Sequence, residues 1–180
     1  MENIKKTFLF LAVIALAGSG LHCGYSTHSG MPSGYRTIHV EPFKNKINYT
    51  DENRRNVYFP LMEVTARNAI VKRITFDGNL RIKKEPSQAD VILKGNLVGY
   101  ERQPLRYDEN DNVIEYRIQV IVDLVLWDVK QDVQVWEEKG FVGETTYFQT
   151  GVNAMSEAGA LDKAMEDLGR RVVERTVENW

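Results

Sequence analysis

The chain has 180 residues, 23 of them basic and 25 acidic, with a formal net charge of −2. Nucleic acid is therefore not an expected partner, because that mode of binding depends on an excess of positive charge. The length is sufficient for one domain with its own hydrophobic core.

The first 22 residues have the composition of a secretory signal peptide. Lys5 and Lys6 make the start basic, an apolar run covers residues 8–17, and small residues follow at 18–20. That order is typical of export signals, and the run is shorter than the roughly 20 residues of a membrane-spanning helix. We expect residues 1–22 to be removed, which leaves 158 residues with a net charge of −3.

Cys23 is the only cysteine, so it has no partner for an internal disulfide. Its position directly after the signal predicts that it becomes the first residue of the mature protein and carries acyl chains such as palmitate. Two or three such chains hold a protein firmly on a membrane. His22 and Gly20 depart from the small residue and the leucine that usually precede a lipidated cysteine. The alternative is cleavage near residues 15–17, which would leave Cys23 as a free thiol.

The remaining chain reads as a short linker followed by one domain. Residues 23–34 are rich in Gly and Ser and predict a lipidated N-terminus and linker, so the domain is expected to span residues 35–180. Alternating residues over 35–41 predict a first strand that ends before Pro42. The polar stretch from 44 to 55 predicts a loop.

A helix is predicted over residues 56–74, where apolar side chains recur near the spacing of one helical face. Pro60 fits this helix if it lies in the first turn, where a missing N–H has no cost. Leu80 and Ile82 then predict a short strand. The apolar face of the helix is expected to contain Val57, Leu61, Val64, Val71 and Ile74.

Three long segments with a period of two follow, at residues 90–100, 113–127 and 133–148. The connections at 108–112 and 128–132 are short and polar. Antiparallel hairpins are therefore expected.

The period changes to about 3.6 from residue 153 onward, which predicts a long amphipathic helix at the end of the chain. Its apolar stripe contains Ala154, Ala158, Leu161, Met165, Leu168 and Val172.

These elements predict an α+β fold in which two helices pack on one face of a mostly antiparallel sheet, because this arrangement buries both apolar stripes. The other face of the sheet is expected to be polar or to meet a partner. It would carry Glu115, Arg117, Gln119 and Asp123.

The sequence contains no recognisable catalytic or metal-binding motif, so an enzyme is disfavoured. His39 is interpreted as a histidine on a strand surface. The acidic run at 108–111 lacks the glycine and the closing glutamate of a calcium loop and predicts a solvated hairpin tip. Trp127, Trp136 and Tyr147 are interpreted as packing residues.

Short motifs occur in order at Cys23-Gly24-Tyr25, at residues 37–45, 89–95, 104–109, 115–117 and 135–138, and in the closing helix. Taken in this order, they resemble the LptE family of lipopolysaccharide-assembly lipoproteins. Each motif is weak alone, but together they extend over nearly the whole mature chain. The resemblance implies a fold of two helices against a four-stranded sheet, no enzymatic activity and no cofactor apart from the covalent lipid at Cys23.

The resemblance also implies a location and a role. The protein would be anchored by lipid to the outer membrane, act as the plug and assembly partner of the LptD β-barrel, and handle lipopolysaccharide on its way to the cell surface. The alternative is an envelope lipoprotein on the periplasmic side that binds a ligand or stabilises the envelope without a barrel partner.

A contact with lipopolysaccharide would need exposed cations to bind its phosphates. The candidates lie after the first strand, near the tip of the first long hairpin and on the polar face of the sheet. Each could instead be an ordinary solvated charge. They are Lys44, Lys46, Arg102, Arg106 and Arg117.

Overall fold

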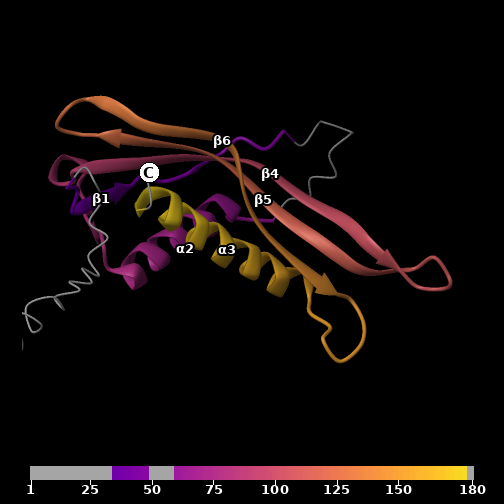
Figure 1. Ribbon diagram of the computed structural model, residues 1–180. Coiled ribbons are helices and arrows are strands. Elements are labelled where there is room, and N and C mark those ends of the chain that lie inside the picture. The colour runs from indigo at the N-terminus through magenta and orange to yellow at the C-terminus, as the bar shows by residue number, and fades with distance from the viewer. Residues whose placement is uncertain (1–33, 49–58, 178–180) are drawn as a thin grey trace, which may run out of the picture.

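The computed structural model describes residues 34–48 and 59–177. These residues form one α+β unit, in which two α-helices cover the same face of a six-stranded mixed sheet (Figure 1). The predicted signal peptide, the lipid attachment at Cys23 and almost all of the predicted linker lie outside the described residues.

Three long antiparallel strands make up most of the sheet: β4 (Val91–Tyr107), β5 (Val113–Asp128) and β6 (Val133–Phe148). The bounds of β6 agree with the predicted ones, and β5 ends one residue later than predicted. β4 continues for seven residues beyond its predicted end at Tyr100. Alternate residues of β5 face the helices and are buried, namely Ile118, Val120, Val122, Leu124 and Leu126.

The predicted four-stranded, mostly antiparallel sheet is wrong in strand number and in the direction of the short strands. β1 (Thr37–Val40) pairs in parallel with β3 (Arg81–Ile82) and with β4, and β2 (Lys44–Asn45) also pairs in parallel with β4. A helix lies between β2 and β3, and such a crossover returns the chain in the same direction. The 3₁₀ turn η1 (Pro86–Gln88) then leads into β4. β2 has two residues, too few for a detectable period, and falls where a loop was predicted.

The first helix, α2 (Met62–Asp77), packs a different face on the sheet from the predicted one, and of the predicted apolar residues that the structure describes only Ile74 is buried. Its buried residues recur at every fourth position, whereas Leu61 and Val64, which were predicted to be buried, are exposed. Both faces of this helix carry apolar residues, so periodicity did not determine which face packs on the sheet. Leu61 has a left-handed backbone at the N-cap, and the helix therefore begins after Pro60. The buried residues are Met62, Ala66, Ile70 and Ile74.

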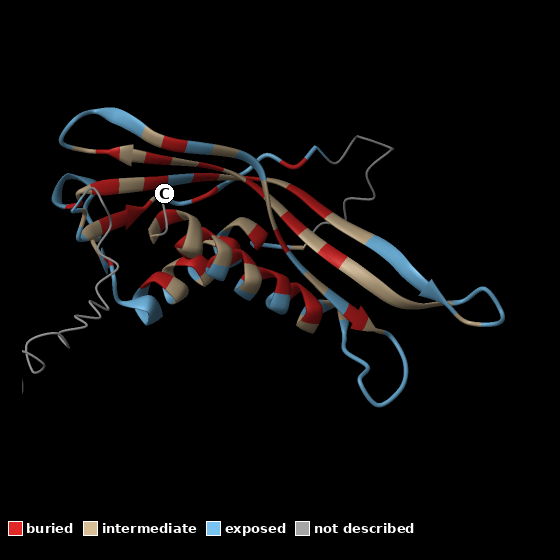
Figure 2. Ribbon diagram, viewed as in Figure 1, coloured by how far each residue is buried: buried red, intermediate tan, exposed pale blue. Residues whose placement is uncertain are grey.

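The second helix, α3 (Glu157–Val177), confirms the predicted stripe from Leu161 onward. Ala154 is exposed and precedes the helix, which begins at Glu157; Ala158 lies in the first turn of the helix and is also exposed. Glycines allow close approach: a Cβ on Gly143 of β6 would lie 2.6 Å from the carbonyl oxygen of Ala164. Figure 2 shows the buried residues along the interface of sheet and helices, with exposed residues at the turns. Within residues 34–48 and 59–177, neither helix is long and apolar enough to cross a membrane.

Candidate functional site

The long strands separate two ends of the molecule (Figure 1). We call the end where residues 35–37, Asp90 and the 128–132 turn meet the entry end. The hairpin end contains residues 102–117 and the loop 149–156 that precedes α3. At about 3.3 Å per residue, the 17 residues of β4 extend over about 55 Å from the entry end to the tip of the hairpin end.

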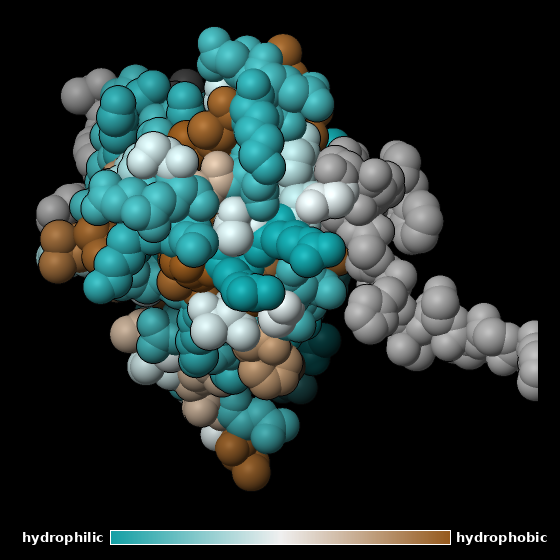
Figure 3. All heavy atoms as spheres, turned by 90° about the vertical axis from the view of Figure 1, so that its left-hand side faces the viewer, coloured by the Kyte–Doolittle hydropathy of each residue, from teal (hydrophilic) through white to brown (hydrophobic). Residues whose placement is uncertain are grey.

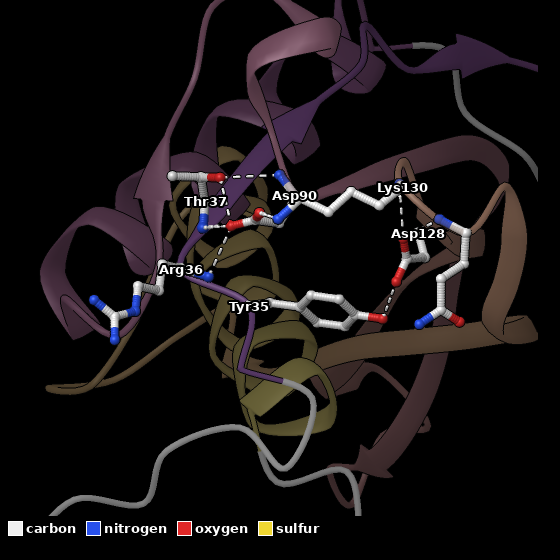
Figure 4. A network of polar contacts seen from close by, with 7 residues as sticks. Tyr35, Arg36, Thr37, Asp90, Asp128 and Lys130 are labelled. Atoms are coloured by element: carbon white, nitrogen blue, oxygen red, sulfur yellow. Dashed lines mark hydrogen bonds and ion pairs between the residues drawn. The ribbon is translucent and has the colours of Figure 1, made fainter.

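At the entry end, one carboxylate holds the first residues of the domain. Oδ2 of Asp90 accepts hydrogen bonds from the backbone N–H groups of Arg36 and Thr37, at 3.0 and 3.1 Å, and from the Thr37 hydroxyl at 2.8 Å. The Thr37 hydroxyl in turn accepts the N–H of Asp90 at 2.9 Å. Figure 4 shows these contacts between the start of β1 and the start of β4.

A second carboxylate joins the same end to the β5–β6 turn. The Tyr35 hydroxyl donates to Oδ2 of Asp128 at 2.5 Å, and Oδ1 accepts the N–H groups of Lys130 and Gln131 at 2.8 Å each. The Lys130 ammonium lies 2.7 Å from Oδ1 of Asp90, so Lys130 links the two carboxylates, one through its side chain and the other through its backbone N–H (Figure 4). The residues that follow the linker are thus fixed to both long hairpin strands.

These contacts lower the pKa values of the two carboxyl groups at the entry end. The Lys130 ammonium, then the Arg36 N–H and the Thr37 groups, hold the pKa of Asp90 far below its usual range. The Tyr35 hydroxyl and the turn N–H groups lower the pKa of Asp128. Both carboxylates are therefore ionised and engaged within the domain. Seen from this end, the surface is mostly hydrophilic with isolated apolar patches (Figure 3).

At the hairpin end, a register shift separates the candidate arginines onto two faces. Arg102 pairs with Ile118, which faces the helices, whereas Arg106 pairs with Glu115 on the outer face. Arg102 and Arg106 are four residues apart, and an uninterrupted strand would place them on one face. The extra residue between Pro104 and Arg106 reverses this relation.

Arg102 lies on the inner face, and its charge is already neutralised. Its guanidinium is 2.5 Å from Oε2 of Glu157 on α3 and 4.8 Å from the centre of the Tyr116 ring. The Tyr100 hydroxyl donates to the other Glu157 oxygen at 2.8 Å, and burial, followed by this carboxylate, raises the pKa of Tyr100 well above its usual range. Tyr147 stacks on Tyr116 with ring centres 5.8 Å apart. This cluster attaches α3 to the hairpin.

Arg106 and Arg117 lie on the outer face and are less engaged. Nε of Arg106 is 3.5 Å from Oε2 of Glu115, and its guanidinium lies 5.6 Å from the centre of the Phe148 ring. Arg117 is two residues from Glu115 on β5 and therefore shares its face. Among the described residues, no hydrogen bond or ion pair joins the Arg117 side chain to a partner, although its backbone pairs within the sheet. These two cations can accept an external anion without breaking a strong internal contact.

Lys44 and Lys46 are exposed but lie elsewhere. Lys44 is in β2 and pairs with Asn96 of β4, and the backbone of Lys46 donates to the carbonyl oxygen of Leu97. These positions are near the middle of the sheet, six or more residues along β4 from the arginine pair. The structure therefore does not bring the five candidate cations into one site.

Sequence reasoning missed an apolar component of the hairpin end. Leu105 and Tyr107 on β4 are 40% and 52% exposed, and Val152 and Met155 in the loop before α3 are also exposed. The Gln149 N–H donates to the Ile114 carbonyl, which places this loop beside the hairpin. The signal in the sequence was two apolar residues in a segment otherwise typical of a loop. The hairpin end thus combines exposed apolar side chains with two available arginines.

The remaining candidate sites have structural roles. His39 is not on the surface as predicted: it is buried, and its Nδ1–H donates to the Lys83 carbonyl oxygen at 2.9 Å. Asp108 accepts the N–H groups of Asn110 and Asn112, which confirms a hairpin tip. Trp136 and Tyr147 are buried, as expected of packing residues. In the described part of the chain, no group of three or more His, Cys, Asp or Glu residues could hold a metal ion.

Comparisons with known proteins identify a family and several similar folds. A model of the LptE family, described as lipopolysaccharide-assembly, matches residues 35–176. The structure of protein XCC0632 from Xanthomonas campestris aligns with a TM-score of 0.56 and 11% identity, over 79% of this chain and 84% of that one. A comparison with curated proteins finds no match.

Two further solved structures share the fold. The hypothetical protein CT253 from Chlamydia trachomatis has a TM-score of 0.52 at 10% identity, over 79% of this chain and 96% of its own. The uncharacterised lipoprotein B from Nitrosomonas europaea also has a TM-score of 0.52, at 12% identity, over 84% and 86% of the two chains. At these identities the likeness is one of fold alone.

Proposed function

Because the chain belongs to the LptE family of lipopolysaccharide-assembly lipoproteins, we propose that it is an outer-membrane lipoprotein that acts as plug and assembly partner of an LptD β-barrel. The observation that carries this proposal is the family match over residues 35–176, which includes every strand of the sheet and nearly all of α3. The family is described as lipopolysaccharide-assembly, and the proposed role requires no catalytic group.

We propose that lipid on Cys23 provides the membrane attachment. The entry end supports this proposal, since Asp90 and Asp128 hold residues 35–37 firmly where the linker joins the domain. Eleven extended linker residues would reach up to about 40 Å, so the domain would stay close to the membrane. Mass spectrometry of the mature N-terminus tests the anchor. An unmodified N-terminus upstream of Cys23 would contradict it and would leave the rest of the proposal intact.

For lipopolysaccharide, we propose a contact at the hairpin end. Arg106 and Arg117 supply cations for phosphate groups, and the exposed side chains of Leu105 and Tyr107 supply apolar surface for acyl chains. Arg102 would contribute less, because Glu157 already neutralises it. Lys44 and Lys46 would form a separate, weaker contact.

Copurification tests the barrel partnership. A tagged full-length chain is solubilised from its own host in mild detergent, and the bound proteins are identified by mass spectrometry. Recovery of a large β-barrel protein is the expected result. The matched control is Cys23→Ser, which tests whether recovery depends on the anchor. If no barrel protein is recovered with the lipidated chain, the assembly role fails and the barrel-independent envelope lipoprotein is the better description.

A further inference from the structure

The outer edge of β6 is open to pairing with another molecule unless something covers it. β6 is the last strand of the sheet in the part of the chain that the structure describes. The backbone N–H and C=O groups along such an edge can pair with a strand of a second molecule. Residues 141–148 are suited to that pairing, because they are mostly β-branched or aromatic, contain one charged residue and lack proline. An uncovered β6 would therefore be expected to add a strand.

Helix α3 lies along this part of β6 and satisfies backbone groups of its outer edge (Figure 1). Oδ2 of Asp167 accepts the N–H of Glu144 at 3.1 Å, and the Arg171 guanidinium donates to the Val142 carbonyl oxygen. Val142 and Glu144 are two residues apart, so their backbone groups point to the same side of the strand. Asp167 and Arg171 are four residues apart, so they share one face of the helix. Two side chains of α3 thus occupy hydrogen-bonding positions that a neighbouring strand would use.

Close packing brings these two side chains to the strand. Gly143 lies between the two residues that they contact, and a Cβ at this position would overlap the side chain of Leu168. Because Gly143 has no side chain, α3 approaches β6 closely enough for Asp167 and Arg171 to reach its backbone. Oδ1 of Asp167 also accepts a hydrogen bond from Arg170 at 2.6 Å, which fixes the orientation of the carboxylate.

The rest of the β6 edge is protected by other means. The loop before α3 covers the end of the strand, where the Met155 N–H donates to the Phe148 carbonyl oxygen at 2.9 Å. The first half of β6 has two register shifts against β5, and such bulges twist an edge away from a partner strand. Residues 141–148 pair with β5 without a shift. The contacts from α3 therefore lie on the stretch of edge that is regular enough to add a strand.

We propose that α3 seals residues 142–148 of β6 against strand addition by a second copy of this chain, with Asp167 and Arg171 as the sealing residues. A second copy fits the edge, because antiparallel pairing of two β6 strands about Thr145 places Glu144 opposite Thr146. The two glutamates are then not directly opposite each other, which would be destabilising. The inference is independent of the proposed function, since it concerns only the contact between α3 and β6.

Measurements of self-association test the seal on the full chain, purified in mild detergent. Asp167→Ala with Arg171→Met removes both sealing groups and keeps the net charge. We expect the association constant to rise by about tenfold, which corresponds to one or two backbone hydrogen bonds gained between the strands. The matched control is Asp162→Ala with Lys163→Met, which makes an equivalent change at exposed residues of the same helix. Its association constant, measured by analytical ultracentrifugation, should equal that of the unmodified chain.

Adding Thr146→Pro to the unsealed variant locates the new contact. The N–H of Thr146 points to the same side of the strand as that of Glu144, away from β5, so proline at this position removes no hydrogen bond of the sheet. The same proline blocks an added strand. It is therefore expected to return the association constant to its original value.

Each outcome supports or overturns the seal. An unchanged association constant in the folded, unsealed variant overturns it. Association that persists after Thr146→Pro also overturns it, because the contact then lies elsewhere on the molecule. Circular dichroism establishes that each variant folds. If the double substitution unfolds the chain, Asp167→Ala alone takes its place in the same measurement, with the same outcomes.

Discussion

The entry end and the hairpin end use charge in opposite ways. At the entry end, the charged side chains of Asp90, Asp128 and Lys130 are bonded to one another or to the backbone of β1 and the β5–β6 turn. At the hairpin end, Arg106 has one long ion pair, and the Arg117 side chain has no hydrogen-bond or ion-pair partner among the described residues.

This difference suggests that the charges of the entry end stabilise the fold, whereas those of the hairpin end bind a ligand. The charged groups of the entry end join the start of β1, the start of β4 and the β5–β6 turn, so they stabilise the fold and have few free positions for binding a ligand. Charges with weak internal partners contribute little to stability, since exposed ion pairs are worth 1 kcal/mol or less. The comparison predicts that substitutions at the entry end change stability, whereas substitutions on the outer face of the hairpin end change binding.

The largest effect is expected for Asp90→Asn. The amide keeps the size of the side chain but loses the charge that accepts three hydrogen bonds and pairs with Lys130. We expect the free energy of unfolding to fall by about 2 kcal/mol, because hydrogen bonds to charged groups are stronger than neutral ones. Urea denaturation at pH 7 measures this change.

Glu109→Gln is the matched control for Asp90→Asn, because it makes the same chemical change at the exposed hairpin tip. Its effect is expected to stay within about 0.5 kcal/mol. Equal effects of the two substitutions would show that the entry end has no special structural role.

The pH dependence of stability gives a second test of the entry end. The folded-state pKa values of Asp90 and Asp128 are lowered, so their contribution is present above the unfolded value of 3.8 and is lost as the pH falls toward the folded values. We expect the stability difference between the unmodified chain and Asp90→Asn to be constant near neutrality and to shrink below about pH 4. A difference that instead grows with acidification would contradict the ionised network.

A smaller effect is expected for Arg102→Met, which removes the ion pair with Glu157 and the contact with the Tyr116 ring. Because both charged groups are partly exposed, we expect a loss of about 1 kcal/mol. Arg106→Met provides the comparison on the outer face, with an expected loss below about 0.5 kcal/mol. Thermal unfolding of both variants measures whether the two arginines differ. If Arg106→Met proves the more destabilising, the division between the two faces is wrong.

The division between Arg102 and Arg106 also marks the limit of sequence reasoning. The bounds of β6 could be predicted, because a regular alternation runs between clearly polar turns. The faces of the two arginines could not, because the register shift after Pro104 has no signature in the alternation itself. Likewise, α2 carries apolar residues on both faces, so the pattern predicted a helix but not which side packs on the sheet.

The entry-end network was equally hidden from sequence reasoning. In the sequence, Asp90 begins a predicted strand and Asp128 and Lys130 lie in a predicted turn. Only tertiary structure brings them to residues 35–37. The candidate arginines were predicted from their charge and position alone. The exposed residues Leu105 and Tyr107 beside them became apparent only when the full length of β4 was known.

The smallest effect on stability, and the largest on binding, is expected for the double substitution Arg106→Gln and Arg117→Gln. The free energy of unfolding should change by less than about 0.5 kcal/mol, because both side chains lie at the surface with weak partners. Lipopolysaccharide binding by the purified domain should fall by about tenfold, which corresponds to the loss of one charge-assisted contact of about 1.4 kcal/mol. Lys44→Gln with Lys46→Gln is the matched control, since it removes the same charge from the middle of the sheet. Unchanged binding in the arginine variant would remove the hairpin end as the lipopolysaccharide contact, and a loss confined to the lysine variant would move that contact to β2.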